Sequence, residues 1–155
     1  MVGARLSTER QTRRGVPADE PPAVKSARRR RRGRADGPRS ALVVEADPVL
    51  RRTCLGALEA AGFVVASVES GIAAVAAARH RPPDLIVIDS QLPDVPWRVA
   101  IHWLRSNPGL RSVPVVVLTP RALDGGDILA AQPVAAVRKP ISEESIREGL
   151  ATLLG

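Results

Sequence analysis

Three uninterrupted runs of apolar residues, each about as long as a strand, most constrain the fold of this chain. They cover residues 41–44, 85–88 and 115–118. A strand with one face in water alternates apolar and polar side chains, whereas a strand covered on both faces has no need to alternate. We therefore expect these runs to be interior strands of a parallel sheet with helices on both of its faces.

Helix start and stop signals lie between the runs. Asp47 before Pro48 is a favourable start, because aspartate caps the first turn and proline fits the first helical position. Gly62 is a favourable stop, and Ser142 is a favourable cap for the last helix. The alternation of elements predicts an α/β fold, an open five-stranded parallel sheet with helices on both faces. We expect strands over 41–45, 63–68, 84–89, 113–119 and 134–137, and helices over 48–61, 70–80, 97–105, 123–131 and 143–154.

Two of these helices have a weak pattern. The helix over 70–80 is rich in alanine, and we expect Ile72, Val75 and Ala76 to face inward. The helix over 123–131 is short, and Gly125 and Gly126 disfavour its start, because glycine gives up more backbone entropy than other residues on entering a helix.

The net charge of +7 is concentrated in the first 40 residues, which carry 12 basic and 4 acidic residues, against 11 and 12 in residues 41–155. Because the first part also lacks an apolar pattern, we expect residues 1–39 to be a disordered tail before a domain at 40–155. The tail contains the run Arg28, Arg29, Arg30, Arg31 and Arg32, which could bind nucleic acid, an acidic partner or an anionic membrane surface. The favoured alternative is that the run is only a solvated tail or an over-extended start of the reading frame, because blocks of like charge are usually disordered arms. No aromatic residue is interleaved to stack bases, so nucleic-acid binding is the least favoured hypothesis.

The cysteine content and the lack of long apolar segments indicate the cellular compartment. Cys54 is the single cysteine, which excludes an internal disulfide and is typical of a reducing environment. No segment has the roughly 18 apolar residues of a membrane span, and no apolar stretch follows the N-terminal arginines as in a secretory signal. We therefore expect a cytoplasmic protein without a membrane partner.

A polar residue ends four of the expected strands: Glu45, Asp89, Thr119 and Lys139. The carboxyl ends of parallel strands meet at one edge of the sheet, so these four side chains should converge there. Two carboxylates, a hydroxyl and the only lysine of residues 41–155 form a set suited to phosphoryl transfer, with a carboxylate as nucleophile and a divalent cation beside it. No glycine-rich phosphate loop follows the first strand, which argues against a nucleotide or flavin site.

Residues 41–155 resemble a response-regulator receiver domain, the flavodoxin-like (βα)5 module that accepts a phosphoryl group from a histidine kinase. The resemblance rests on Leu-Val-Val-Glu at 42–45, Pro-Pro-Asp-Leu-Ile-Val-Ile-Asp at 82–89, Pro-Val-Val-Val-Leu-Thr at 114–119 and Lys-Pro at 139–140. It implies a doubly wound parallel sheet, and Asp89 as the phosphoacceptor. It also implies a Mg²⁺ site of Glu45, Asp89 and the main chain of Gln91, and Thr119 and Lys139 as phosphate-responsive residues. A receiver is a signalling protein and not an enzyme, and its expected partners are a histidine kinase or phosphotransfer protein and a downstream effector.

The chain departs from the family pattern at several of these places. The second acidic residue usual after the first strand is replaced by Ala46, which should weaken Mg²⁺ binding. Ala136 stands where the family has an aromatic residue that reports phosphorylation, and Pro120 replaces a small residue after the threonine. The glycine usual after the third strand is absent, with Val95-Pro96-Trp97 in that loop.

Two functions therefore stay open at this point. One is a stand-alone receiver phosphorylated on Asp89 in a two-component or phosphorelay pathway. The other is a degenerate receiver that binds partners without phosphorylation, through the surface formed by the fourth helix, fifth strand and fifth helix, which the family commonly uses for its effectors.

Overall fold

The sheet is the framework of the domain. The computed structural model describes residues 37–155, so the run Arg28 to Arg32 and most of the predicted tail lie outside the described residues. Five parallel strands pair in the order β2-β1-β3-β4-β5, which confirms the predicted open parallel sheet. The strands are β1 (Ser40–Val44), β2 (Val64–Val68), β3 (Leu85–Asp89), β4 (Val115–Thr119) and β5 (Val134–Arg138).

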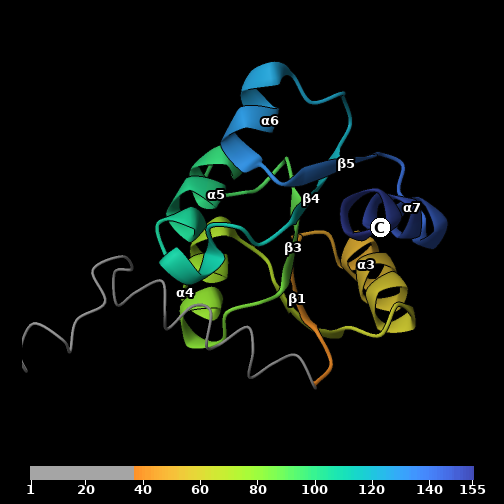
Figure 1. Ribbon diagram of the computed structural model, residues 1–155. Coiled ribbons are helices and arrows are strands. Elements are labelled where there is room, and N and C mark those ends of the chain that lie inside the picture. The colour runs from red at the N-terminus through yellow and green to blue at the C-terminus, as the bar shows by residue number, and fades with distance from the viewer. Residues whose placement is uncertain (1–36) are drawn as a thin grey trace, which may run out of the picture. The chain divides into compact units, whose positions relative to one another are not determined.

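Helices cover both faces of this sheet (Figure 1). The helices are α3 (Pro48–Ala60), α4 (Gly71–His80), α5 (Trp97–Arg105), α6 (Gly125–Ala131) and α7 (Glu143–Leu154), with a 3-10 turn η1 (Pro108–Leu110). One apolar core lies between the sheet and α3 with α7, and the other lies between the sheet and α4 with α5. No helix among the described residues is both long enough and apolar enough to span a bilayer.

The strand order creates a crevice at the carboxyl edge of β1 and β3. The chain first moves outward from β1 to β2 and then returns past β1 to β3. Right-handed crossovers in these opposite directions place α3 and α4 on opposite faces of the sheet. In open α/β sheets such a reversal leaves a crevice beyond the strand ends, and it is where ligands bind. Glu45 and Asp89 lie at the ends of these two strands.

Helix caps explain several boundaries. The Asp47 carboxylate accepts hydrogen bonds from the backbone N–H groups of Val49 (2.8 Å) and Leu50 (3.2 Å), so it caps α3 as predicted. Gly62 has φ of +91°, a conformation that favours glycine, which confirms it as the stop after α3.

The start of α6 is two residues later than predicted. The side chains of Asp124 and Asp127 each accept a hydrogen bond from the other residue's backbone N–H, and so form a reciprocal cap.

The predicted inward face of α4 is confirmed for Val75, which packs against the core, and is wrong for Ile72 and Ala76. Ile72 is 61% exposed and Ala76 is also exposed, whereas Ala74 and Ala78 are fully buried. The reason is close packing: a Cβ on Gly71 would lie 2.5 Å from a Val95 methyl group and 3.2 Å from the Cβ of Ala100. The smallest residues of α4 therefore face α5 and its preceding loop, and the larger Ile72 is turned outward.

Candidate functional site

The strand ends are held side by side by main-chain hydrogen bonds. Glu45 N–H donates to the Val68 carbonyl (3.0 Å), Ser90 N–H to that of Leu118 (2.9 Å), and Lys139 N–H to that of Thr119 (2.9 Å). The residues that follow or end β1, β3, β4 and β5 are thus fixed at one edge of the sheet. This is the edge at which the sequence predicts the site.

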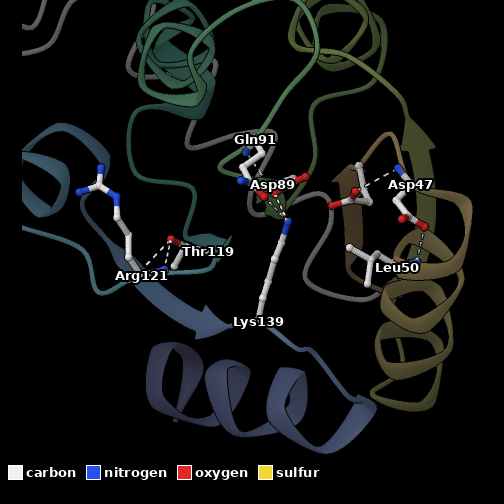
Figure 2. A network of polar contacts seen from close by, with 8 residues as sticks. Asp47, Leu50, Asp89, Gln91, Thr119, Arg121 and Lys139 are labelled. Atoms are coloured by element: carbon white, nitrogen blue, oxygen red, sulfur yellow. Dashed lines mark hydrogen bonds and ion pairs between the residues drawn. The ribbon is translucent and has the colours of Figure 1, made fainter.

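Asp89 and Lys139 form the centre of this site (Figure 2). The Lys139 ammonium lies 2.8 Å from Asp89 Oδ1, and it donates a second hydrogen bond to the side-chain oxygen of Gln91 (3.1 Å). The Gln91 N–H in turn donates to the same Asp89 oxygen (3.1 Å). Asp89 is only 4% exposed. The Lys139 ammonium and the Gln91 N–H together hold its carboxylate in a defined position.

Glu45 is buried next to this pair, with 1% of its surface exposed. Its Oε1 accepts the Asp47 N–H (3.0 Å), but among the described residues no donor is within hydrogen-bond distance of Oε2. Burial raises the pKa of Glu45 to about 7, and the negative charge of Asp89 adds to the increase. A buried carboxylate oxygen without a partner, beside a second carboxylate, is an arrangement that a divalent cation would stabilise.

This shift predicts a pH dependence of stability in buffer that contains a chelator. Between pH 4.5 and about 7 the folded state keeps a proton on Glu45 that the unfolded chain has lost. The free energy of unfolding should therefore fall as pH rises through this interval. Urea unfolding at several pH values measures it, and Glu45→Gln should show a smaller decline. An identical pH profile for both proteins would contradict the raised pKa.

The donor set fits Mg²⁺ incompletely. Among the described residues no group of three histidine, cysteine or acidic side chains is placed to hold a metal ion. Glu45 and Asp89 provide two carboxylates, and the residue next to Glu45 is Ala46, whose side chain is exposed and offers no ligand. Mg²⁺ retains water readily, so two carboxylates and a main-chain carbonyl can bind it with the remaining positions filled by water, though more weakly than three carboxylates.

Thr119 ends β4 as predicted, but its hydroxyl is engaged elsewhere. Thr119 Oγ1 donates to the Arg121 carbonyl (2.8 Å) and accepts the Arg121 N–H (3.3 Å), closing a turn around Pro120. Figure 2 shows Thr119 directed toward Arg121, while Lys139 is directed toward Asp89. The structure thus brings Asp89, Lys139 and Glu45 together, and it leaves the Thr119 hydroxyl outside their direct contacts.

One residue of the site was predicted only in part. The sequence singled out Gln91 for its main chain, yet its side chain also binds the Lys139 ammonium. Its position two residues after the strand-ending Asp89 was the available signal, since a residue there lies in the same crevice.

Ala136 is exposed on β5, so its position carries no aromatic side chain that could move between two states.

Comparison with known proteins agrees with this geometry. A family model described as the response regulator receiver domain matches residues 41–151. The polar-differentiation response regulator DivK of Brucella anthropi is 32% identical over 120 residues, which are 76% of this chain and 98% of that regulator. DivK of Brucella ovis is also 32% identical, over 119 residues that cover 76% of this chain and 97% of the relative.

Solved structures share the same architecture. The chemotaxis response regulator CheY4 of Vibrio cholerae superposes with a TM-score of 0.70 at 19% identity, covering 76% of this chain and 99% of that one, and supports the fold alone. The receiver domain of the sensor histidine kinase PA1611 from Pseudomonas aeruginosa is 28% identical with a TM-score of 0.66, covering 77% of this chain and 99% of that one. That structure contains a magnesium ion coordinated in its active-site cleft.

Proposed function

Because the chain belongs to the response-regulator receiver family, we propose that Asp89 accepts a phosphoryl group from a histidine kinase or a phosphotransfer protein. A receiver is a signalling domain of two-component systems, and its general partner class is the histidine kinase. The proposal concerns the residue that is modified and the residues that assist it. Its cation would be Mg²⁺, held by Glu45, Asp89 and the Gln91 carbonyl.

The observation that carries this proposal is the contact of 2.8 Å between Asp89 and the Lys139 ammonium, next to buried Glu45. When the donor is a phosphohistidine, an oxygen of the Asp89 carboxylate would attack its phosphorus. The P–N bond would then break, and its electron pair would stay on the imidazole. A bound Mg²⁺ supplies positive charge next to the phosphoryl oxygens. Lys139 is placed to bind an oxygen of the product, because it already lies beside the attacking carboxylate.

The test is phosphorylation of the full chain by acetyl phosphate in the presence of Mg²⁺. Intact-mass spectrometry should detect one phosphoryl adduct that disappears when the ion is chelated. A receiver with a complete acidic pocket, treated in parallel, is the positive control. If only that control acquires an adduct, Asp89 is not an active phosphoacceptor.

The missing acidic ligand gives a second expectation. Ala46→Asp should bind Mg²⁺ about tenfold more tightly and acquire the adduct faster, because a third carboxylate replaces a water in the metal's shell. Isothermal titration calorimetry measures the affinity. Ala61→Asp, which adds the same charge at the far end of α3, is the control and should bind as the wild type does. Equal affinities for the Ala46→Asp and wild-type proteins would refute the role assigned to position 46.

Ala46 and Ala136 also favour a second candidate, a receiver that binds its partners independently of phosphorylation. The surface it would use is formed by α6, β5 and α7, where Ile128 and Leu129 are exposed. In that case a partner captured by wild-type protein would bind equally to Asp89→Asn, with and without acetyl phosphate. Binding that changes on phosphorylation would exclude this candidate.

A further inference from the structure

A groove between α4 and α5 has no role in phosphoryl transfer. It contains a cavity of about 240 Å³, and the residues that line it, which define the α4–α5 groove, are Val75, Ala78, Arg79, Trp103, Asn107 and Pro108 with neighbouring Leu104, Ser106 and Leu110. Figure 1 shows α4 and α5 together on one face of the sheet. The helices run against the strands, so the last turns of α4 and α5 lie toward the edge opposite Asp89. The groove is therefore separate from the candidate phosphoacceptor site.

The wall of the α4–α5 groove combines apolar and polar side chains, and it includes an exposed tryptophan. Trp103 is 40% exposed, whereas the other tryptophan, Trp97, is 7% exposed and belongs to the core. Ile72 and Val99 are also exposed, and each lies on the same side of its helix as the groove-lining residues Val75 and Trp103. The indole can cover a large apolar contact while its N–H bonds to a polar group, which is why tryptophan is enriched where proteins bind one another.

Among the residues that line the α4–α5 groove, Arg79 is the one charged side chain. The two helices contain three arginines, Arg79, Arg98 and Arg105, and no carboxylate of their own, although Asp94 binds the N–H groups at the start of α4. Two of the arginines are engaged: Arg98 pairs with Asp127 (3.5 Å), and Arg105 donates to main-chain carbonyls. Arg79 lines the cavity, is exposed, and forms no ion pair with another described residue. A ligand of the groove would therefore meet an arginine without any opposing acidic side chain among the lining residues.

We propose that the α4–α5 groove binds an acidic segment of a partner protein, which inserts one leucine-sized or phenylalanine-sized side chain beside Trp103 and places a carboxylate on Arg79. Charge complementarity selects the partner, because Arg79 is the charged side chain among the lining residues and a basic segment would be repelled by it. The size of the cavity supports a peptide side chain over a free small molecule, since small-molecule sites usually enclose about 300–1,000 Å³. The inference does not depend on phosphorylation of Asp89.

The test uses three synthetic peptides without tryptophan, added to the full ¹⁵N-labelled chain. One has a single leucine flanked by glutamates, the second has lysines in place of the glutamates, and the third has serine in place of the leucine. We expect the acidic leucine peptide to shift the Trp103 indole N–H resonance and to leave that of Trp97 unmoved. We expect binding at least about fivefold weaker for each of the other peptides, and weakening with added salt.

Two variants locate the contact. Arg79→Glu should lower the affinity for the acidic leucine peptide about tenfold, and Trp103→Ala should lower this affinity by at least the same factor. Arg52→Glu, an exposed charge reversal on α3, is the matched control and should bind as the wild type does. Because Arg79 is exposed, its reversal tests the proposal even if Trp103→Ala disturbs folding.

Several results would overturn the proposal. The first is a Trp103 resonance that does not shift at any concentration of the acidic leucine peptide. The second is equal binding of this peptide by Arg79→Glu and wild type, and the third is tighter binding of the lysine peptide than of the acidic one. Self-association of the chain that is lost in Trp103→Ala would also overturn it, because a second copy would then be the occupant of the α4–α5 groove.

Discussion

Asp89→Asn is expected to abolish the phosphoryl adduct that acetyl phosphate and Mg²⁺ produce on the wild-type chain. The amide has nearly the shape of the carboxylate, so the buried site should stay folded, but its nitrogen and oxygen are poor nucleophiles toward phosphorus. The change also removes the ion pair with Lys139, whose Nζ lies 2.8 Å from Asp89 Oδ1. Intact mass after a fixed incubation is the measurement.

Asp47→Asn is the matched control for this variant. Asp47 is an exposed neighbour of the site whose carboxylate caps α3, and asparagine caps helices about as well as aspartate does. This variant should acquire the adduct as the wild type does. An adduct that persists in Asp89→Asn would place the modification on another residue, and its loss in Asp47→Asn would assign Asp47 a direct role in the site.

The largest expected effect on stability comes from Arg105→Met. The Arg105 guanidinium donates to the carbonyls of Leu110 (2.7 Å), Ala131 (2.8 Å) and Gln132 (3.1 Å), and also to that of Val113. It thus joins the end of α5 to η1 and to the end of α6. Methionine keeps most of the apolar stem but leaves the carbonyls without this donor, so we expect a loss of about 3 kcal/mol in the free energy of unfolding.

Urea unfolding measures this loss as a lower midpoint at an unchanged slope. Arg111→Met is the control, because Arg111 is an exposed arginine six residues further on whose side chain forms no hydrogen bond or ion pair with another residue of 37–155. It should change the free energy of unfolding by no more than about 0.5 kcal/mol. Similar midpoints for the two variants would show that the Arg105 hydrogen bonds are replaced by water at little cost.

Much of the fold could be predicted because its signals are local. The buried runs of β1, β3 and β4, the Asp47-Pro48 start of α3 and the Gly62 stop each act within a few residues. The alternation of strands and helices then leaves few topologies, because parallel strands need crossovers and crossovers have one hand. The same rule placed Glu45, Asp89 and Lys139 at one edge before any contact was known.

The predictions failed where a residue's environment comes from distant parts of the chain. Ile72 and Ala76 were expected to face inward together with Val75. The close approach of Val95 and Ala100 to Gly71 turns the alanine side inward instead. Thr119 lies at the predicted edge of the sheet, and there a local turn around Pro120 binds its hydroxyl to Arg121.

The order of residues alone thus determines that this chain forms a receiver-type parallel sheet and which four polar residues end or directly follow its strands, since backbone hydrogen bonding and burial of apolar runs follow from local pattern. The contacts among those residues depend on packing. The Lys139 ammonium reaches Asp89 and Gln91, the Glu45 Oε2 is buried without a donor from the part of the chain that the structure describes, and Arg105 joins three segments. Such contacts depend on distances of a few ångströms between elements, which no periodicity encodes.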